Sequence, residues 1–284
     1  RDPEMSRGLG DVYKRQLWFF LICKERVMQS VETPSVKASI KSIINNKPIL
    51  LMTLSQILGS FAVGGSKQDY YIDVLNFASL GLITGIPGAI INPFSYMAVP
   101  WFRRHFSSRF LYIIGNKIDG ILLVPVFLVG CIGGKKHGLY KNIWVMGIAM
   151  MLWETIFMIF YGVRRIIPTE MYNEAMDYCE WKNGYRTEGM TSVAQGLASK
   201  LANIFSRYIS NYIKQLIGYD LTRYVRGTAQ TDETKFGLFA MFTIVPFLTG
   251  MVSIIPMLFY DLSGKKKEKM YEDCLLYTSD AADD

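Results

Sequence analysis

The chain has 284 residues, of which 50% are hydrophobic and 19% are charged, and its formal net charge is +7. The charged fraction lies below the roughly 25% that is usual for soluble domains, and the apolar content excludes intrinsic disorder. Two histidines and four cysteines are too few to indicate a His/Cys metal site or a disulfide scaffold. Because the charges cluster between long apolar runs, the pattern is typical of a polytopic membrane protein.

The two ends of the chain differ from the rest. Residues 1–16 (RDPEMSRGLGDVYKRQ) and 274–284 (CLLYTSDAADD) show no apolar periodicity. Both look like translated sequencing-library adaptor, so we exclude them from fold reasoning; the alternative is two genuine polar tails. Without these 16 and 11 residues the chain is 257 residues long. Its net charge becomes +9, because the first tail carries one net positive charge and the second three negative charges.

Six apolar runs are each long enough to cross a bilayer of about 30 Å. They are Pro48–Ser66, Val74–Phe102, Phe110–Gly133, Ile143–Val163, Gly189–Ile213 and Phe236–Tyr260. The sequence therefore predicts an all-α, six-helix transmembrane bundle over residues 48–262. Residues 17–47 are expected to be the end of a preceding span plus a cytoplasmic linker, and 263–273 a cytoplasmic tail. A large soluble all-α protein is the alternative.

The second run carries three prolines, Pro87, Pro93 and Pro100, so we expect its helix to be kinked or interrupted. Orientation follows from the loops, because Lys and Arg favour the cytoplasmic side. Sixteen of these residues lie in one set of loops and eight in the other. The richer set, which comprises the linker, 103–109, 164–188 and 263–273, is predicted to be cytoplasmic in the plasma membrane. This topology explains the basic charge without a nucleic-acid partner.

A charge inside a membrane span costs at least about 2.5–3.5 kcal/mol on insertion scales, so each one requires a reason. The third run contains Lys117 and Asp119, the fourth Glu154, and the fifth Lys200 and Arg207. Lys117 and Asp119 are two positions apart and do not face each other on a helix. We expect these two residues and Arg207 to be charges within the bundle, with Lys117 or Asp119 contacting a neighbouring span.

The fifth run has one polar face. Gly196, Lys200, Asn203 and Arg207 follow helical spacing, and leucines and isoleucines lie opposite them. A helix with one wet face inside a bundle lines water or a site, so Lys200 and Asn203 are candidates for a substrate and cation path. The alternative is a structural ion pair, for instance Lys200 with Glu154.

Trp153 and Glu154 are adjacent in the fourth run. Sugar sites usually combine a carboxylate, which accepts hydrogen bonds from hydroxyl groups, with an aromatic ring, which covers an apolar face of the sugar. The pair is therefore a second candidate for the substrate path. The alternative is a chance pairing near the membrane interface.

A mixed acidic, basic and aromatic loop lies between the fourth and fifth runs. Glu170, Glu174 and Asp177 share one helical face, ready to pair with Arg164, Arg165 or arginines of another loop, and Gly184 is expected to end the helix. This loop resembles that of the glycoside–pentoside–hexuronide:cation symporters, the melibiose-carrier-like branch of the major facilitator superfamily. The matching positions are Asp177, Tyr178, Glu180, Trp181, Gly184, Arg186, Glu188 and Gly189.

The resemblance implies the carboxy-terminal half of a twelve-helix transporter that couples sugar or glycoside uptake to Na⁺ or H⁺. It implies that Lys200 lies near the cation and sugar sites. The main ligands of the coupling ion would belong to the missing amino-terminal half, which is an expected partner together with the bilayer and a small sugar. The loop residues would form a cytoplasmic gate, and no further cofactor is implied.

Two rival functions remain open at this stage. One is a relative in the same superfamily that carries a lipid or a drug-like solute. The other is a polytopic membrane enzyme. An enzyme of that kind would need an acid/base or metal motif at the interface, but no Asp-x-x-Asp pair lies near a histidine, and His105 and His137 are isolated in the sequence.

Overall fold

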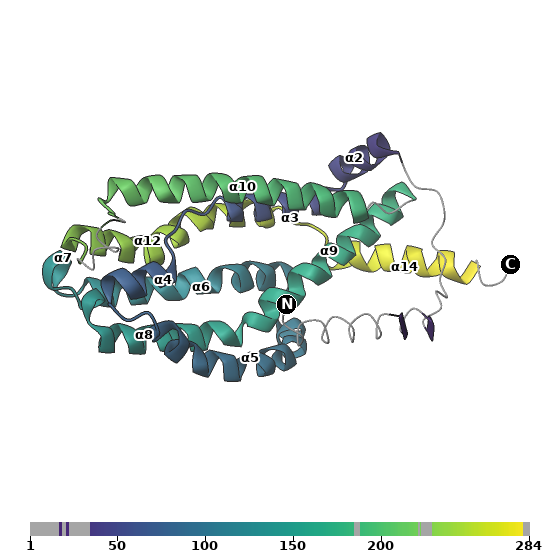
Figure 1. Ribbon diagram of the computed structural model, residues 1–284. Helices are drawn as coiled ribbons and strands as arrows, with labels where there is room; N and C mark the ends of the chain where they lie inside the picture. Colours follow the sequence, from purple (N-terminus) through teal and green to yellow (C-terminus); the bar gives the residue numbers. More distant parts are fainter. Residues whose placement is uncertain are drawn as a thin grey trace. The chain divides into compact units, whose positions relative to one another are not determined.

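The computed structural model describes residues 17–18, 21–22, 35–184, 188–220, 222 and 229–280, and these residues include no strand. The chain divides into two units, residues 1–35 and 36–284. In the first unit only Ser35 and the helical residues 17–18 and 21–22 are described. The second unit is a bundle of helices (Figure 1). The predicted adaptor segment 1–16 and the end of the other segment, 281–284, lie outside the described residues.

The bundle contains long helices joined by short helical pieces (Figure 1). In chain order they are α2 Val36–Asn45, α3 Lys47–Ser60, α4 Lys67–Asp69, the π-helix η1 Tyr70–Val74, α5 Leu80–His105, α6 Ser108–Cys131, α7 Gly134–His137, the 3₁₀ helix η2 Leu139–Lys141, α8 Ile143–Ile159, α9 Tyr161–Asn183, α10 Glu188–Leu216, α12 Asp232–Gly250, the 3₁₀ helix η3 Met251–Ser253, α13 Ile254–Leu258 and α14 Lys265–Asp280.

Four segments are long and apolar enough to cross a membrane. They are Leu80–His105, Ser108–Cys131, Ile143–Asn183 and Asp232–Leu258. These segments correspond to four of the six predicted spans, and the all-α fold class is confirmed. The other two predicted spans also form helices, but α3 has only 14 residues. The 29-residue α10 is long enough but too polar to qualify, because it presents a broad polar face.

The helix boundaries differ from the prediction at two places. The fourth run was expected to end at Val163, but the chain breaks at Phe160 and continues as α9 to Asn183. Gly184 then ends α9 with a positive φ of 76°, which confirms the predicted stop. The predicted interruption of the second run does not occur inside α5, which is continuous through its three prolines. The irregular backbone instead precedes α5, at the π-helix Tyr70–Val74 and residues 75–79.

Polar caps fix several helix starts and also join helices. The Asn46 side chain accepts a hydrogen bond from Ile49 N at the start of α3 and donates one to the Ala175 carbonyl of α9, at 3.2 and 2.7 Å. Ser107 accepts from Phe110 N in the same way at the start of α6. Because Asn46 is almost fully buried, α3 is held against α9 at this end of the bundle.

The long helices pack in a defined set of pairs. α5 packs against α8 and α9, α6 packs against α12, α9 and α8, and α10 lies beside α3 (Figure 1). Gly162 in α9 meets α5 so closely that a Cβ there would lie 2.5 Å from the Ser95 carbonyl oxygen. Gly115 in α6 lies against the Arg164 backbone, where a Cβ would be 3.2 Å away. These glycines let the helix backbones approach and set their register.

Two large apolar clusters and a small third one, Ile49, Ala175 and Met176, hold the bundle. One large cluster consists of Tyr70, Tyr71, Val74, Leu75, Leu80, Leu123, Val126, Tyr140, Met146, Met150, Leu238, Phe239 and Phe242. The other large cluster consists of Met52, Val99, Leu111, Tyr112, Val163, Ile167, Met171, Tyr178, Met257, Tyr260, Leu262 and Met270. On α6, for example, Asn116 and Lys117 lie between Tyr112 of the second cluster and Leu123 of the first. On this helix, polar side chains therefore lie between the two large clusters.

Candidate functional site

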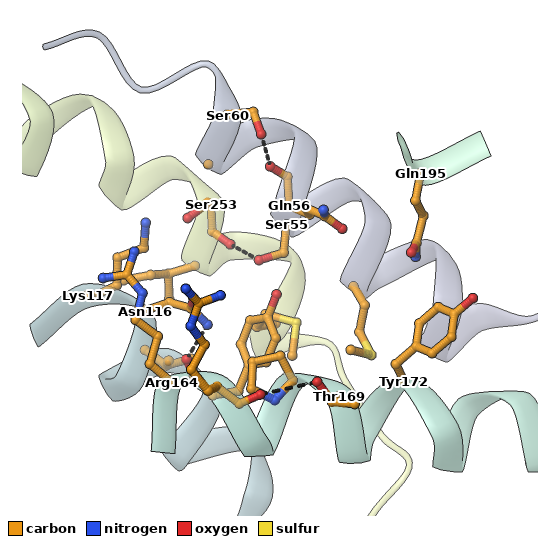
Figure 2. Close-up of a pocket in the computed structure, with 18 residues that line it drawn as sticks. Ser55, Gln56, Ser60, Asn116, Lys117, Arg164, Thr169, Tyr172, Gln195 and Ser253 are labelled. Carbon is orange, nitrogen blue, oxygen red and sulfur yellow. Dashed lines mark hydrogen bonds between the residues drawn. The ribbon is translucent and has the colours of Figure 1, made fainter. Parts of the chain in front are cut away.

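A cavity of about 610 Å³ lies between α3, α6, α9, α10 and the η3–α13 segment (Figure 2). Its volume is in the range of small-molecule sites. The lining residues are Met52, Ser55, Gln56, Gly59, Ser60, Tyr112, Ile113, Asn116, Lys117, Arg164, Arg165, Pro168, Thr169, Tyr172, Gln195, Ser253, Ile254 and Met257. Hydroxyl, amide and cationic groups predominate in this set, whereas an ordinary membrane core is apolar.

One wall of the cavity is tied together by hydrogen bonds to backbone carbonyls. The Ser55 hydroxyl donates to the Ser253 carbonyl at 2.7 Å, and the Ser253 hydroxyl donates to the Gly250 carbonyl at 2.9 Å. The Lys117 ammonium donates to the same Gly250 carbonyl at 2.6 Å. These bonds join α3, α6 and the end of α12, and the Gly250 carbonyl holds the Lys117 ammonium against α12.

Asp119 is shared between two helices. Its carboxylate forms a 3.1 Å ion pair with Arg164 of α9, and its backbone carbonyl accepts a 3.0 Å hydrogen bond from the Trp153 indole of α8. The prediction that Lys117 or Asp119 contacts a neighbouring span is confirmed, and both do. Arg164 therefore pairs with Asp119, and not with the acidic loop face that was one predicted partner.

The remaining polar groups reach the cavity from α9 and α10. Arg165 donates two hydrogen bonds to the Tyr161 hydroxyl, at 3.1 and 3.0 Å. The Gln195 amide donates to the Thr53 hydroxyl at 2.6 Å, which joins α10 to α3. The Tyr172 hydroxyl lies 3.0 Å from the Ser192 hydroxyl. The cavity is thus bordered by groups that both donate and accept hydrogen bonds.

Trp153 and Glu154 lie in a second polar cluster, towards the other apolar core. Glu154 forms a 2.8 Å ion pair with Lys67, and the Lys67 nitrogen lies 5.6 Å from the Trp153 ring and 5.8 Å from the Tyr71 ring. The alternative pairing of Glu154 with Lys200 is therefore wrong. Burial raises the pKa of Tyr71 to about 12, so its hydroxyl stays protonated at neutral pH.

Lys200 and Asn203 are exposed on α10 and do not line the cavity of Figure 2. Their role in a substrate path stays a prediction. Arg207 is also exposed and lines a separate cavity of about 440 Å³ beside Ser210. Two serines of α10 contact the segment that follows α3: Ser206 donates to the Ala62 carbonyl at 2.7 Å and Ser210 accepts from Gly64 N at 3.2 Å.

The predicted gate residues lie at the end of α9 and the start of α10. Trp181 donates to Asp273 of α14 at 3.0 Å, and Tyr178 is buried beside it, with the ring centroids 5.7 Å apart. Asp177 lines a cavity of about 770 Å³, and Glu180 is exposed at the same end of α9. Gly189 is exposed in α10. Arg186 and the Glu188 side chain lie outside the described residues.

On the acidic face of α9, which includes Glu170 and Glu174, one residue pairs with an arginine as predicted. Glu170 pairs with Arg103, an arginine of another loop. Glu174 pairs with Lys267 of α14 instead of an arginine. These two ion pairs tie α9 to α5 and to α14.

Three residues of these sites were not recognisable as site residues from the sequence: Arg164 and Arg165, which fall in a predicted loop, and Lys67. A usable signal existed for Arg164, because Asp119 inside a span needed a cationic partner and Arg164 lies at the end of the neighbouring apolar run. No comparable signal marked Lys67, because its approach to Glu154 depends on the turn after α3.

Comparison of the sequence with known proteins assigns the chain to a family. The profile of the family described as MFS/sugar transport protein matches residues 17–264. The chain belongs to this family. The predicted membership of the major facilitator superfamily, in a branch like the glycoside–pentoside–hexuronide symporters, is thereby confirmed. The family consists of multi-pass membrane transporters, so the rival interpretation as a polytopic enzyme is set aside.

Curated relatives carry names of sugar carriers. The chain is 23% identical over 258 residues to the glucuronide carrier protein homolog of Escherichia coli K12, covering 87% of this chain and 52% of the relative. It is 24% identical to the putative sulfoquinovose importer of the same strain, covering 90% and 53%. It is also 24% identical to the isoprimeverose transporter of Lactiplantibacillus pentosus, covering 90% and 51%. The chain spans about half the length of the curated relatives it matches.

Proposed function

We propose that this chain forms the carboxy-terminal bundle of a secondary transporter in the plasma membrane, which imports a sugar or glycoside together with Na⁺ or H⁺. In such transporters two bundles rock about a site near the midplane of the membrane and expose it to each side in turn. The relatives' names, glucuronide carrier homolog, sulfoquinovose importer and isoprimeverose transporter, support a sugar as the cargo.

The observation that carries the proposal is the polar cavity beside the second apolar cluster, whose Met52, Tyr112 and Met257 line it. Ordered polar side chains in the middle of a membrane bundle are costly unless they serve a path or a site. Serine hydroxyls, amides and tyrosines suit the many hydroxyl groups of a sugar, which both donate and accept hydrogen bonds. The cavity residues Gln56, Asn116 and Gln195 are therefore our candidates for contacts with sugar hydroxyls.

Other residues are assigned supporting roles in this proposal. Lys200 and Asn203 would face the path from the exposed side of α10, where the second bundle would lie. Trp153 and Glu154 would border the path beyond Asp119. The main ligands of the coupling ion would come from the other half of the transporter. The α9 end with Asp177 and Glu180, and Arg186 and Glu188 after it, would form cytoplasmic contacts that close and open with each cycle.

A transport assay tests the proposal. The full-length protein that contains this chain would be reconstituted in proteoliposomes and supplied with radiolabelled methyl glycosides under an inward Na⁺ or H⁺ gradient. We expect uptake above the level of empty liposomes, and we expect ionophores that collapse the driving gradient to remove the accumulation. Uptake that ignores both gradients, or competition by lysolipids but not by glycosides, would contradict a cation-coupled sugar symporter.

The assignment of Lys200 is tested in the same assay. We expect Lys200→Leu to reduce uptake or to change its cation dependence, whereas Lys136→Leu, at an exposed lysine of α7, serves as a control with the same loss of charge. Unchanged uptake and unchanged cation dependence in Lys200→Leu would remove Lys200 from the path without affecting the transporter assignment.

A further inference from the structure

The turn between α5 and α6 carries exposed cationic and aromatic side chains at the end of two membrane spans. Both helices are long and apolar enough to cross a bilayer, and only Phe106 and Ser107 join them. By helix rise, the 26 residues of α5 extend over about 39 Å, which exceeds the roughly 30 Å of the hydrocarbon core. The last turn of α5 and the first turn of α6 therefore reach the depth of the lipid headgroups.

Two arginines of this turn have no acidic partner within the described residues. Arg104 is exposed, and its neighbour Arg103 differs from it because Arg103 pairs with Glu170 of α9. Arg109 is also exposed, and its guanidinium donates to an uncharged acceptor, the Leu258 carbonyl, at 3.1 Å. The turn thus presents two guanidinium groups that no carboxylate of the described chain neutralises.

An exposed apolar stripe of α5 leads to Arg104. Its members recur at spacings of three and four residues, so they share one face of the helix, and each is 56–77% exposed: Leu82, Ile86, Ile90, Phe94, Met97 and Trp101. Arg104 follows Met97 by seven positions and Trp101 by three, so it lies on the same face. Although α5 packs against α8 and α9, this face stays uncovered. In a membrane it contacts acyl chains, and Arg104 lies where those chains meet their headgroups.

Aromatic rings surround the arginines. The Trp101 and His105 rings lie 4.5 Å apart, and His105 Nδ1 is 2.9 Å from the Trp101 carbonyl oxygen. Across the turn, the Phe106 and Phe110 rings stack at 5.3 Å. Aromatic side chains at this depth anchor a helix end in the headgroup region. These contacts hold the turn in place, so a lipid bound there would meet groups that are already ordered.

We propose that the α5–α6 turn binds one anionic phospholipid, with Arg104 and Arg109 on its headgroup and its acyl chains along the apolar stripe of α5. Arginine suits a phosphate because its planar guanidinium can form two parallel hydrogen bonds to it. Phosphatidylglycerol keeps its negative charge, whereas phosphatidylcholine carries its own cation beside the phosphate. Two arginines without a carboxylate therefore favour the anionic lipid. The site concerns the membrane partner of the chain and is independent of the transported solute.

Lipid retention tests this site. The full-length protein that contains this chain would be reconstituted in vesicles of equal parts phosphatidylglycerol and phosphatidylcholine with the same acyl chains. It would then be extracted in mild detergent, and the retained lipids would be quantified by mass spectrometry. We expect phosphatidylglycerol to be retained at least about fivefold over phosphatidylcholine, as one basic residue near a membrane surface predicts. Equal retention of the two lipids would overturn the proposal.

Adjacent arginines provide matched variants. Arg104→Gln should lower the ratio of retained phosphatidylglycerol to phosphatidylcholine about fivefold, whereas Arg104→Lys, which keeps the charge, should preserve most of it. Arg103→Gln removes the same charge one position away but breaks the pair with Glu170, so it should lower the Tm and leave the lipid ratio unchanged. An unchanged ratio in Arg104→Gln would overturn the site. Equal losses in Arg103→Gln and Arg104→Gln would also overturn it, because they would indicate diffuse attraction to a basic surface.

Discussion

Asp73 lies outside the membrane-spanning segments, in the π-helix Tyr70–Val74, and only 8% of its surface is exposed. Burial raises the pKa of its carboxyl above the usual value of 3.8, and the neighbouring Asp69 acts in the same direction. A 3.1 Å hydrogen bond from the Tyr219 hydroxyl and the charge of Lys214 oppose this shift only in part. The ionised form is therefore less favourable in the folded protein than in the unfolded chain.

The raised pKa of Asp73 predicts a pH-dependent effect on stability. A carboxyl whose pKa is raised on folding contributes stability below its unfolded pKa, and this contribution is lost as pH rises through the folded value. We expect Asp73→Asn to raise the Tm at pH 7.5, because asparagine still accepts the Tyr219 hydrogen bond without a charge. This increase in Tm should become smaller as the pH falls towards 3.8. Thermal unfolding in detergent at several pH values measures it.

Asp69→Asn serves as the matched control for Asp73. Asp69 forms an ion pair with Lys214. Asp69→Asn removes this pair and should therefore lower the Tm at pH 7.5, whereas Asp73→Asn should raise it. A lower Tm for Asp73→Asn at neutral pH would show that its charge stabilises the fold and would contradict the burial argument.

Two adjacent lysines of α14 should differ strongly in their contribution to stability. Lys267 pairs with Glu174, whose side chain is only 7% exposed, whereas Lys266 pairs at 3.1 Å with Asp261, which is 41% exposed. Removal of Lys267 leaves a buried carboxylate without its partner, so Lys267→Met should cost up to about 3–5 kcal/mol. Lys266→Met should cost about 0–1 kcal/mol, because an exposed ion pair is screened by water. Equal shifts in Tm for the two variants would show that α14 does not depend on the Glu174 contact.

The sequence indicated which charged residues needed partners but not which partners they would have. Lys117 and Asp119 were recognisable as span charges from their apolar surroundings alone. Their partners, the Gly250 carbonyl and Arg164, lie 133 and 45 residues further along the chain. Which groups meet depends on the relative register of packed helices, and a pattern within one helix does not contain that register.

At the scale of helices, the contact between α5 and α9 depends on one glycine. A Cβ at Gly162 would lie 2.5 Å from the Ser95 carbonyl oxygen and 2.9 Å from the Tyr96 Cα, both of which belong to the backbone of α5. Gly162→Ala should therefore force the two helices apart and cost about 1–3 kcal/mol, measured as a loss of Tm. Gly196→Ala in α10 meets nothing within 4 Å, so it should be neutral or gain up to about 1 kcal/mol from helix propensity. Equal effects at the two glycines would contradict close packing at Gly162.

Helix ends were predictable where the backbone itself is special. Gly184 could be recognised as a stop because only glycine adopts positive φ readily. The continuation of the fourth run as α9 was missed, because charged residues such as Glu170 end an apolar run without ending a helix. Likewise, prolines weaken a helix in isolation, but α5 stays continuous through three of them because it packs along α8 and α9.

The sidedness of the whole molecule can be measured with introduced cysteines. The distribution of Lys and Arg predicts that the loop with Arg104 is cytoplasmic and that the α7 region with Lys136 faces outward. Both residues are exposed. In a background with the native cysteines replaced by serine, we expect an impermeant maleimide added to intact cells to label Lys136→Cys. Arg104→Cys should react only after the cells are permeabilised. The opposite labelling pattern would invert the proposed topology.

At the scale of the molecule, the fold class and the family followed from patterns that repeat along the chain. Apolar runs and the loop from Asp177 to Gly189 were sufficient for both. The cavity was not predictable, because its lining comes from five separate segments, two of which contribute a single polar residue each, Gln195 and Ser253. Gln56, Asn116 and Gln195 carry no local signal of a site, and only the assembled bundle brings them together.

The division of the bundle into apolar clusters and a polar cavity also affects how proteins of this kind diverge. Core residues such as Met146 and Met171 keep the helices together, whereas Gln56 and Asn116 border open space and can be exchanged at little cost to folding. Under the proposed function, a lineage would acquire a new cargo through single mutations of residues that line the cavity, with each intermediate still inserting into the membrane. Relatives of similar identity to this chain, named for a glucuronide and for isoprimeverose, are the outcome expected of such drift.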